Sequence, residues 1–268
     1  MHRKRVLSSI VLVPLLILLI RYGGITSFWL VVSLAIVLGT YEFYRMVEVR
    51  QLTCYKIPGM ILSWVVSCSF LFQNITLISF TWAFASMVVV VYALFSPYPL
   101  STSIISVSTT VFGITYISWL LSHLVLLRGL EGGQWLIFYL LLIIWAGDTA
   151  AFYIGSYIGK HKLAPVISPK KTVEGAIGGL GISMIASLIA KNWLLPSWDY
   201  KQALVVGGLL AVMGQLGDLG KSIFKRDAGL KDSGNIIPGH GGILDRVDGL
   251  LFSTPVLYYY VVGFGGAS

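Results

Sequence analysis

The sequence predicts an all-α, polytopic integral membrane protein with about nine transmembrane helices. Only 11% of its 268 residues are charged and 56% are hydrophobic. Because soluble domains carry about 25% charged residues, too little charge is present to cover a water-facing surface. The apolar residues also fall in long runs, several near the ~20 residues that a helix needs to cross a bilayer. Runs such as 6–20 lack the alternation of β-barrel strands.

The expected spans follow one another along the chain with short connections. The first has the basic front and apolar segment of a signal peptide, but no small-residue cleavage site follows it, so we expect it to be retained. The third is short enough to be a partial crossing. The nine spans are 6–20, 25–44, 58–73, 76–95, 103–127, 134–158, 173–190, 203–220 and 249–265.

The distribution of Lys and Arg predicts the orientation. With the N-terminus in the cytoplasm, fifteen of the 19 Lys and Arg fall in cytoplasmic segments, and the C-terminus lies outside. The four on the outer side are Arg21, Arg128, Lys191 and Lys201. Cytoplasmic loops of membrane proteins carry such an excess, so the net charge of +8 reflects topology and does not call for a nucleic-acid partner. The two cysteines, Cys54 and Cys68, form no disulfide framework and are interpreted as structural.

The chain also divides by charge along its length. The stretch 217–248 holds five of the 11 acidic residues and five of the 19 Lys and Arg. We therefore expect residues 1–133 to form a scaffold of N-terminal helices. Residues 134–268 are expected to carry a catalytic site on the cytoplasmic side.

Four carboxylates are expected to meet near the cytoplasmic surface. Asp148 and Asp218 lie about fourteen or fifteen residues into spans that enter from outside, a depth of roughly 21 Å at ~1.5 Å per residue. Asp245 and Asp248 open the last span, three residues apart and on one helix face. An acid in a membrane helix usually marks function, although it could instead pair with Lys or Arg only to hold helices together. A hard divalent cation such as Mg²⁺ would relieve their repulsion, and the acids suffice for a second cation.

Basic and hydroxyl side chains accompany these acids. Asp218, Ser222 and Lys225 fall on one stripe of a continuing helix, which would direct a metal ligand, a hydroxyl and an ammonium the same way. Arg226 and Lys231 follow. The next segment, SGNIIPGHGG, can bring backbone N–H groups close to a ligand. His240 within it could donate to a phosphate or act as an acid–base group, and an ordinary loop histidine fits its spacing equally well.

The loop before the seventh span offers a second basic segment, SPKKTVEG. Lys170 and Lys171 precede a helix start whose amides can receive anionic groups, although the positive-inside bias alone could explain both lysines. Glu174 is equally well explained as a first-turn acid. Metal-binding acids beside many bases indicate a polyphosphate substrate, and the membrane setting indicates a lipid as its partner. No GxxxxGK[ST] motif occurs, so a P-loop is not expected.

These segments resemble the signature of the phosphatidate cytidylyltransferases, the CDP-diacylglycerol synthases. The match comprises Ser222-x-Phe224-Lys225-Arg226, Lys231-Asp232-x-Gly234 and Pro238-x-His240-Gly241-Gly242-x-x-Asp245-Arg246-x-Asp248. WAGDTAAFYIG, SPKKTVEG and GDLGKS also fit the family in the expected order. The resemblance covers at least residues 145–250, and Phe152 stands where Tyr is commoner.

The resemblance implies conversion of CTP and phosphatidic acid to CDP-diacylglycerol and pyrophosphate with Mg²⁺, by a multi-helix dimer in the cell membrane. The lipid phosphate would attack the α-phosphorus of CTP. Asp218 and Asp245 would bind metal, with Asp148 and Asp248 beside them. The remaining residues would hold or orient the phosphates: Lys225, Arg226, Lys231, Arg246, Lys170, Lys171 and Ser222. His240 is an additional substrate-binding candidate.

Two alternatives remain. One is a CTP-dependent polyprenol kinase, whose motifs are distantly similar. The other is an ion or phosphate transporter that uses the intramembrane acids as a pathway. Transporters are usually built from pseudo-symmetric halves, whereas the charge here is concentrated in the second half, with 19 of the 30 charged residues in 134–268.

Overall fold

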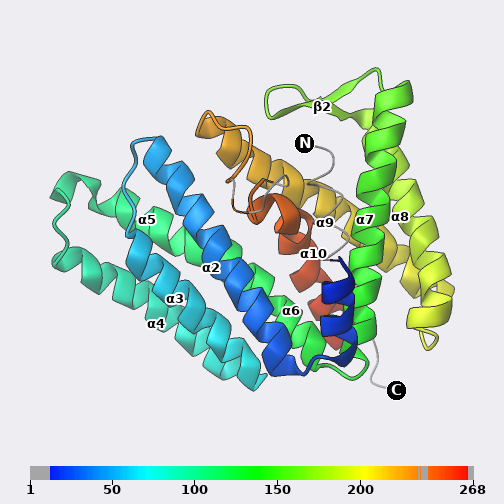
Figure 1. The fold of residues 1–268 in the computed structure, drawn as a ribbon, viewed down its shortest axis with the longest axis horizontal. Coiled ribbons are helices and arrows are strands. Elements are labelled where there is room, and N and C mark those ends of the chain that lie inside the picture. Colours follow the sequence, from blue (N-terminus) through cyan, green and yellow to red (C-terminus); the bar gives the residue numbers. More distant parts are fainter. Residues whose placement is uncertain (1–12, 235, 237–240, 265–268) are drawn as a thin grey trace. The chain divides into compact units, whose positions relative to one another are not determined.

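The computed structural model describes residues 13–234, 236 and 241–264 (Figure 1). The predicted site residue His240 and the first part of the predicted span 6–20 lie outside these residues. The described helices begin with Val13–Tyr22 and continue with α2 (Ile25–Val49), α3 (Lys56–Ser69), η1 (Phe70–Phe72), α4 (Ile75–Leu94), η2 (Leu100–Thr102), α5 (Ser103–Gly113), η3 (Ile114–Trp119), α6 (Leu120–Gly129), α7 (Gly133–Ile158), α8 (Val173–Leu194), α9 (Tyr200–Asp227) and α10 (Leu244–Gly263).

Six helical segments of the described part are long and apolar enough to cross a membrane. They are Ile25–Val49, Ile75–Leu94, Leu100–Gly129, Gly133–Ile158, Val173–Leu194 and Tyr200–Asp227. Helices suit such spans because they satisfy every backbone hydrogen bond internally, which the bilayer core requires. The helical, multi-pass architecture predicted from the sequence is therefore confirmed.

The count of nine spans remains a prediction. The shorter helices Val13–Tyr22 and Lys56–Phe72 lie where the first and third spans were expected. The last predicted span corresponds to α10, which opens with charged residues and contains Pro255. The described residues also contain a small antiparallel hairpin, β1 (Lys162–Ala164) with β2 (Ser168–Thr172), which the sequence did not predict.

The chain forms two compact units, residues 1–129 with 224–246, and residues 130–223 with 247–268. We call them the first and second unit. In the first unit, α3 lies against both α2 and α4, and α6 packs on α2 (Figure 1). Tyr44 of α2 is fully buried and donates to the Thr110 carbonyl, 2.8 Å away. Its ring fills the space beside Gly59 and Gly113, where any Cβ would collide with it.

The helix of the first unit that runs from Ser103 to Gly129 includes a π-helical segment, Ile114–Trp119. Ser118 in this segment donates to the Ser63 carbonyl of α3 at 2.6 Å. Such π-helical insertions are rare and often lie near functional sites. Tyr116 in this segment lies against the ring of Phe224, with centroids 5.3 Å apart, and belongs to an aromatic cluster at the end of α9.

In the second unit, α7 and α8 form the most extensive helix pair. Gly147 and Gly179 lie at this contact, where small residues let membrane helices approach closely. Ser183 strengthens it by donating to the Ile143 carbonyl at 3.0 Å. The hairpin joins the two helices and contacts both. Thr172 ends β2 and caps α8 by accepting from the Gly175 N–H.

Candidate active site

The second unit brings together three of the four predicted carboxylates. Lys221 of α9 lies between two of them: its Nζ is 3.2 Å from Asp218 Oδ1 and also pairs with Asp248 Oδ2 of α10. Lys171 of β2 pairs with Asp218 Oδ2 at 2.7 Å. Asp148 of α7 lies within electrostatic reach of these two carboxylates and two lysines, and we count it with them. We call these five residues the Asp218 cluster.

Close helix packing positions the cluster. Gly217 lies directly against the backbone carbonyl of Asp248, where a Cβ would collide. Gly214 and Gly249 lie nearby on the same two helices, and a Cβ added at either would crowd Ile144 of α7. Asp248 is oriented by the Gly249 N–H, which donates to its Oδ1 at 2.7 Å. Lys171 comes from the hairpin, which Glu174 holds by accepting from the His161 N–H and pairing with its Nδ1.

The charges of the cluster do not cancel. Among the described residues, the cluster holds three carboxylates and two ammonium groups, so the acids outnumber the bases by one. Lys221 is buried, with 5% of its side chain exposed, whereas Asp218 keeps 32%. A buried ammonium needs its carboxylate partners, so Lys221 acts as the fixed cation of the group. Asp218 and Asp148 are exposed enough to reach a ligand.

A hard cation fits this donor set. Among the described residues, no three or more His, Cys, Asp and Glu side chains gather closely enough to enclose a metal ion. Mg²⁺ seldom needs such a cage, because it usually binds one or two carboxylates together with water and substrate phosphates. Asp218 and Asp248 are the carboxylates that would meet this requirement, with a cation there taking the place of Lys171 or Lys221 as their partner.

The fourth predicted carboxylate, Asp245, belongs to a cluster of the first unit. Its Oδ1 pairs with Lys225 Nζ at 2.7 Å, and its Oδ2 accepts from the Ser233 N–H at 3.0 Å. Ser233 Oγ also donates to Oδ2, at 3.1 Å, and the Gly242 N–H lies 3.4 Å from it. Both oxygens of Asp245 are therefore engaged within the protein.

Glu42 of α2 organises this second cluster. It is 1% exposed and accepts from Ser233 Oγ, from the Ile243 N–H and from the Leu244 N–H at 2.9 to 3.0 Å. The carboxylate thus caps the N-terminus of α10, where the helix dipole favours a negative charge. Gly234 and Gly242 lie so close to Glu42 that any Cβ there would collide with it. We call Glu42, Lys225, Ser233, Gly242 and Asp245 the Glu42 cluster.

Sequence reasoning missed Glu42, and a usable signal was present. Glu42 lies inside the predicted span 25–44, and the rule applied to Asp148, that an acid in a membrane helix marks a constrained site, applies equally to it. Lys221 was counted only as a topological charge. Its burial between two carboxylates depends on how α9 packs against α10, which no local pattern reveals.

The remaining predicted residues are placed as follows. Ser222 is buried in α9 of the second unit. Lys170 is exposed on β2, next to the paired Lys171. Arg226, Lys231 and Arg246 of the first unit are exposed. Asp218, Ser222 and Lys225 do share the continuous helix α9, but Asp218 pairs with Lys171 and Lys221, whereas Lys225 pairs with Asp245. The metal and substrate roles of these residues stay predictions.

Comparison with known proteins supplies the family. Residues 3–264 match the cytidylyltransferase family. The chain belongs to this family. It is 34% identical to a phosphatidate cytidylyltransferase of Synechocystis sp., over 98% of this chain and 97% of that protein. It is 43% identical to a phosphatidate cytidylyltransferase of Bacillus subtilis and 51% identical to one of Staphylococcus aureus, over 56% and 45% of this chain. These two alignments span 56% and 46% of the relatives.

The family predicted from the sequence is thereby confirmed. This member of the family is a nucleotidyltransferase with several membrane-crossing helices. Membership also implies the use of a divalent cation. The Asp218 cluster, with its excess negative charge, is the candidate site for that cation in the second unit.

Proposed function

We propose that the protein is a phosphatidate cytidylyltransferase. It transfers the cytidylyl group of CTP to phosphatidic acid, giving CDP-diacylglycerol and pyrophosphate for phospholipid biosynthesis. The observation that carries this proposal is the end-to-end relation to the Synechocystis protein, which covers 98% of this chain. A multi-pass helical protein with an acid–base cluster in its helices suits a reaction between a nucleotide and a lipid.

In the proposed reaction, a phosphate oxygen of the lipid attacks the α-phosphorus of CTP and the bond to pyrophosphate breaks. Phosphate monoesters are anionic at neutral pH, so no general base is needed. Catalysis then consists of positioning and of neutralising charge during displacement. We assign positioning of the phosphates to Lys170, Lys171, Ser222 and the bases Lys225, Arg226, Lys231 and Arg246. His240 is a further candidate contact.

Mg²⁺ is the proposed cation, with Asp218 and Asp248 as its ligands in the second unit and Asp148 beside them. Asp245 remains a candidate ligand. When bound, Mg²⁺ would neutralise the triphosphate charge and stabilise the leaving pyrophosphate. The role of Lys221 is to keep Asp218 and Asp248 oriented while leaving the group one charge negative. Lys171, already paired with Asp218 at 2.7 Å, can exchange that carboxylate for a phosphate.

The predicted topology places this chemistry at the cytoplasmic face of the cell membrane, where CTP is available. Residues 134–268 would carry most of the catalytic groups and residues 1–133 would form the scaffold. A homodimer is the proposed assembly. Crosslinking in native membranes tests it.

The experiment is an assay of purified protein with labelled CTP, phosphatidic acid and Mg²⁺. We expect label in CDP-diacylglycerol, release of pyrophosphate, and loss of turnover when Mg²⁺ is chelated. Supplying a polyprenol in place of phosphatidic acid distinguishes the kinase alternative, because label from γ-labelled CTP would then enter the polyprenol. Absence of lipid product from either substrate would refute a CTP-dependent lipid enzyme and favour the transporter.

A further inference from the structure

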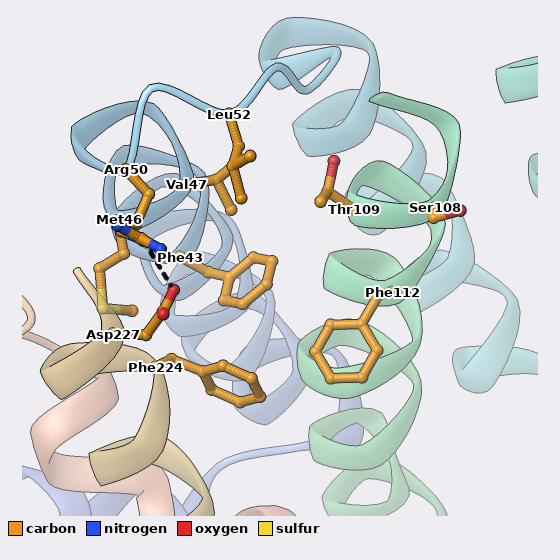
Figure 2. A pocket seen from close by; sticks show the side chains of 10 residues that line it. All are labelled: Phe43, Met46, Val47, Arg50, Leu52, Ser108, Thr109, Phe112, Phe224 and Asp227. Atoms are coloured by element: carbon orange, nitrogen blue, oxygen red, sulfur yellow. Dashed lines mark hydrogen bonds and ion pairs between the residues drawn. The ribbon is translucent and has the colours of Figure 1, made fainter. Parts of the chain in front are cut away.

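An apolar pocket in the first unit lies at the end of α2 (Figure 2). Its volume is about 480 Å³, within the ~300–1,000 Å³ of small-molecule sites. Val47 and Leu52 form one side and Phe112 the other, and Phe224 lies at the base. The charged side chains that line it are Arg50 and Asp227, which pair at 3.3 Å.

The family signature contributes Phe224 to the pocket. Phe224 packs edge-on against Phe43 and Phe112, with ring centroids 5.6 and 5.5 Å apart. The same last turn of α9 carries Lys225, whose ammonium pairs with Asp245 in the Glu42 cluster. A molecule held against Phe224 therefore contacts the turn that presents Lys225 and Arg226.

The chemistry of the pocket fits one end of an amphiphile with an anionic head. Its walls are mainly apolar, and its guanidinium can form two parallel hydrogen bonds with a phosphate. The ion pair with Asp227 is no obstacle, because the two side chains are 54% and 56% exposed and exposed pairs contribute little. Arg50 can therefore turn from Asp227 to a doubly charged phosphate.

We propose that this pocket receives the glycerol and adjoining acyl segment of phosphatidic acid, and that Arg50 contacts its phosphate. This inference rests on the proposed function and adds the site at which the lipid substrate is held. In the predicted topology, the end of α2 lies at the cytoplasmic surface, where a lipid headgroup in the inner leaflet would lie. The phosphate thus stays at the water boundary while the chain remains in apolar surroundings.

The test measures the KM for dioleoyl phosphatidate in mixed micelles and, separately, the KM for CTP. Leu52→Trp fills the pocket, and we expect the lipid KM to rise about tenfold with an unchanged CTP KM. Leu100→Trp is the matched control, because Leu100 is 89% exposed and lies outside the pocket. It should leave both constants unchanged. If Leu52→Trp leaves the lipid KM unaltered, the pocket does not hold the substrate.

The ion pair gives an independent test that does not depend on folding of the filled variant. Arg50→Gln should also raise the lipid KM about tenfold, whereas Asp227→Asn, which releases Arg50 for the phosphate, should lower it. An equal rise in both variants would mean that only the ion pair matters, and would overturn the assignment. Wild-type protein without activity on phosphatidate would instead refute the proposed function.

Discussion

The Asp218 cluster and the Glu42 cluster contain the same kinds of side chain but use them differently. In the Glu42 cluster, the carboxylates accept mainly from backbone N–H groups and a serine, only Asp245 also pairs with a lysine of the cluster, and Glu42 is 1% exposed. In the Asp218 cluster, carboxylates face ammonium groups, one negative charge is left over, and Asp218 is 32% exposed. Acids satisfied by the backbone hold a fold together, whereas exposed acids with excess charge can bind a ligand.

The largest expected effect is a loss of activity without a loss of stability on substitution of Asp218. Asp218→Asn should lower kcat by about a thousandfold, because a group that stabilises transition-state charge is removed. Stability should change little, since Lys221 keeps Asp248 as its partner. Turnover and thermal unfolding in the same detergent measure the two effects. Asp199→Asn is the matched control, because the exposed Asp199 lies outside both clusters. Near-normal turnover of Asp218→Asn in Mg²⁺ would remove Asp218 from the site.

Asp245 tests whether one residue can serve both catalysis and stability. Asp245→Asn should abolish CTP-dependent lipid formation and also lower the free energy of unfolding by about 1–2 kcal/mol, because Lys225 loses its charged partner. A double-mutant cycle with Lys225→Met measures the coupling. Additive losses of stability would show that the 2.7 Å pair contributes nothing. A stable variant with full activity would show that Asp245 is needed for neither catalysis nor stability.

The Glu42 cluster should respond mainly in stability. Glu42→Gln turns a donor toward backbone N–H groups, and we expect unfolding to become easier by about 3 kcal/mol. Denaturation of the purified protein measures this. Glu48→Gln provides the comparison, because Glu48 pairs with Lys56 near the surface, where exposed pairs are worth about 0–1 kcal/mol. A Glu42→Gln protein of unchanged stability but no activity would show that Glu42 acts in catalysis and does not stabilise the fold.

The smallest expected effect is the chemical labelling of Cys54, which is 3% exposed in the first unit. Burial, with a further contribution from Glu48, raises the pKa of its thiol to about 12. The thiolate is the reactive form, so maleimide should not label Cys54 at pH 8, and reactivity should appear only as the pH approaches 12. Mass spectrometry of labelled protein measures this. With Cys54 unreactive and Cys68 replaced by serine, Lys170→Cys can report which side of the membrane the exposed hairpin occupies, a result that locates the Asp218 cluster.

Much of the fold was predictable because membrane helices can be recognised from their apolar composition. The long apolar runs predicted the six helices that can cross a bilayer. Two segments were harder to predict: α10 mixes charged and apolar residues in its first turn, and the hairpin at 162–172 is too short and polar for a periodic pattern. Small-residue packing, such as Gly217 against Asp248, could not be anticipated, because it depends on two helices meeting.

The sequence by itself determined the class of protein, the family and the residue types of the site. Apolar runs specify membrane helices, and the signature SxFKR…KDxG…PxHGGxxDRxD specifies a cytidylyltransferase. Only the tertiary structure decided which groups each acid contacts. It placed Asp148, Asp218 and Asp248 around the buried Lys221, and it placed Asp245 with the buried Glu42. The physical reason is that a carboxylate's role depends on which cation or N–H group lies within about 3 Å of it, and helix packing sets those distances.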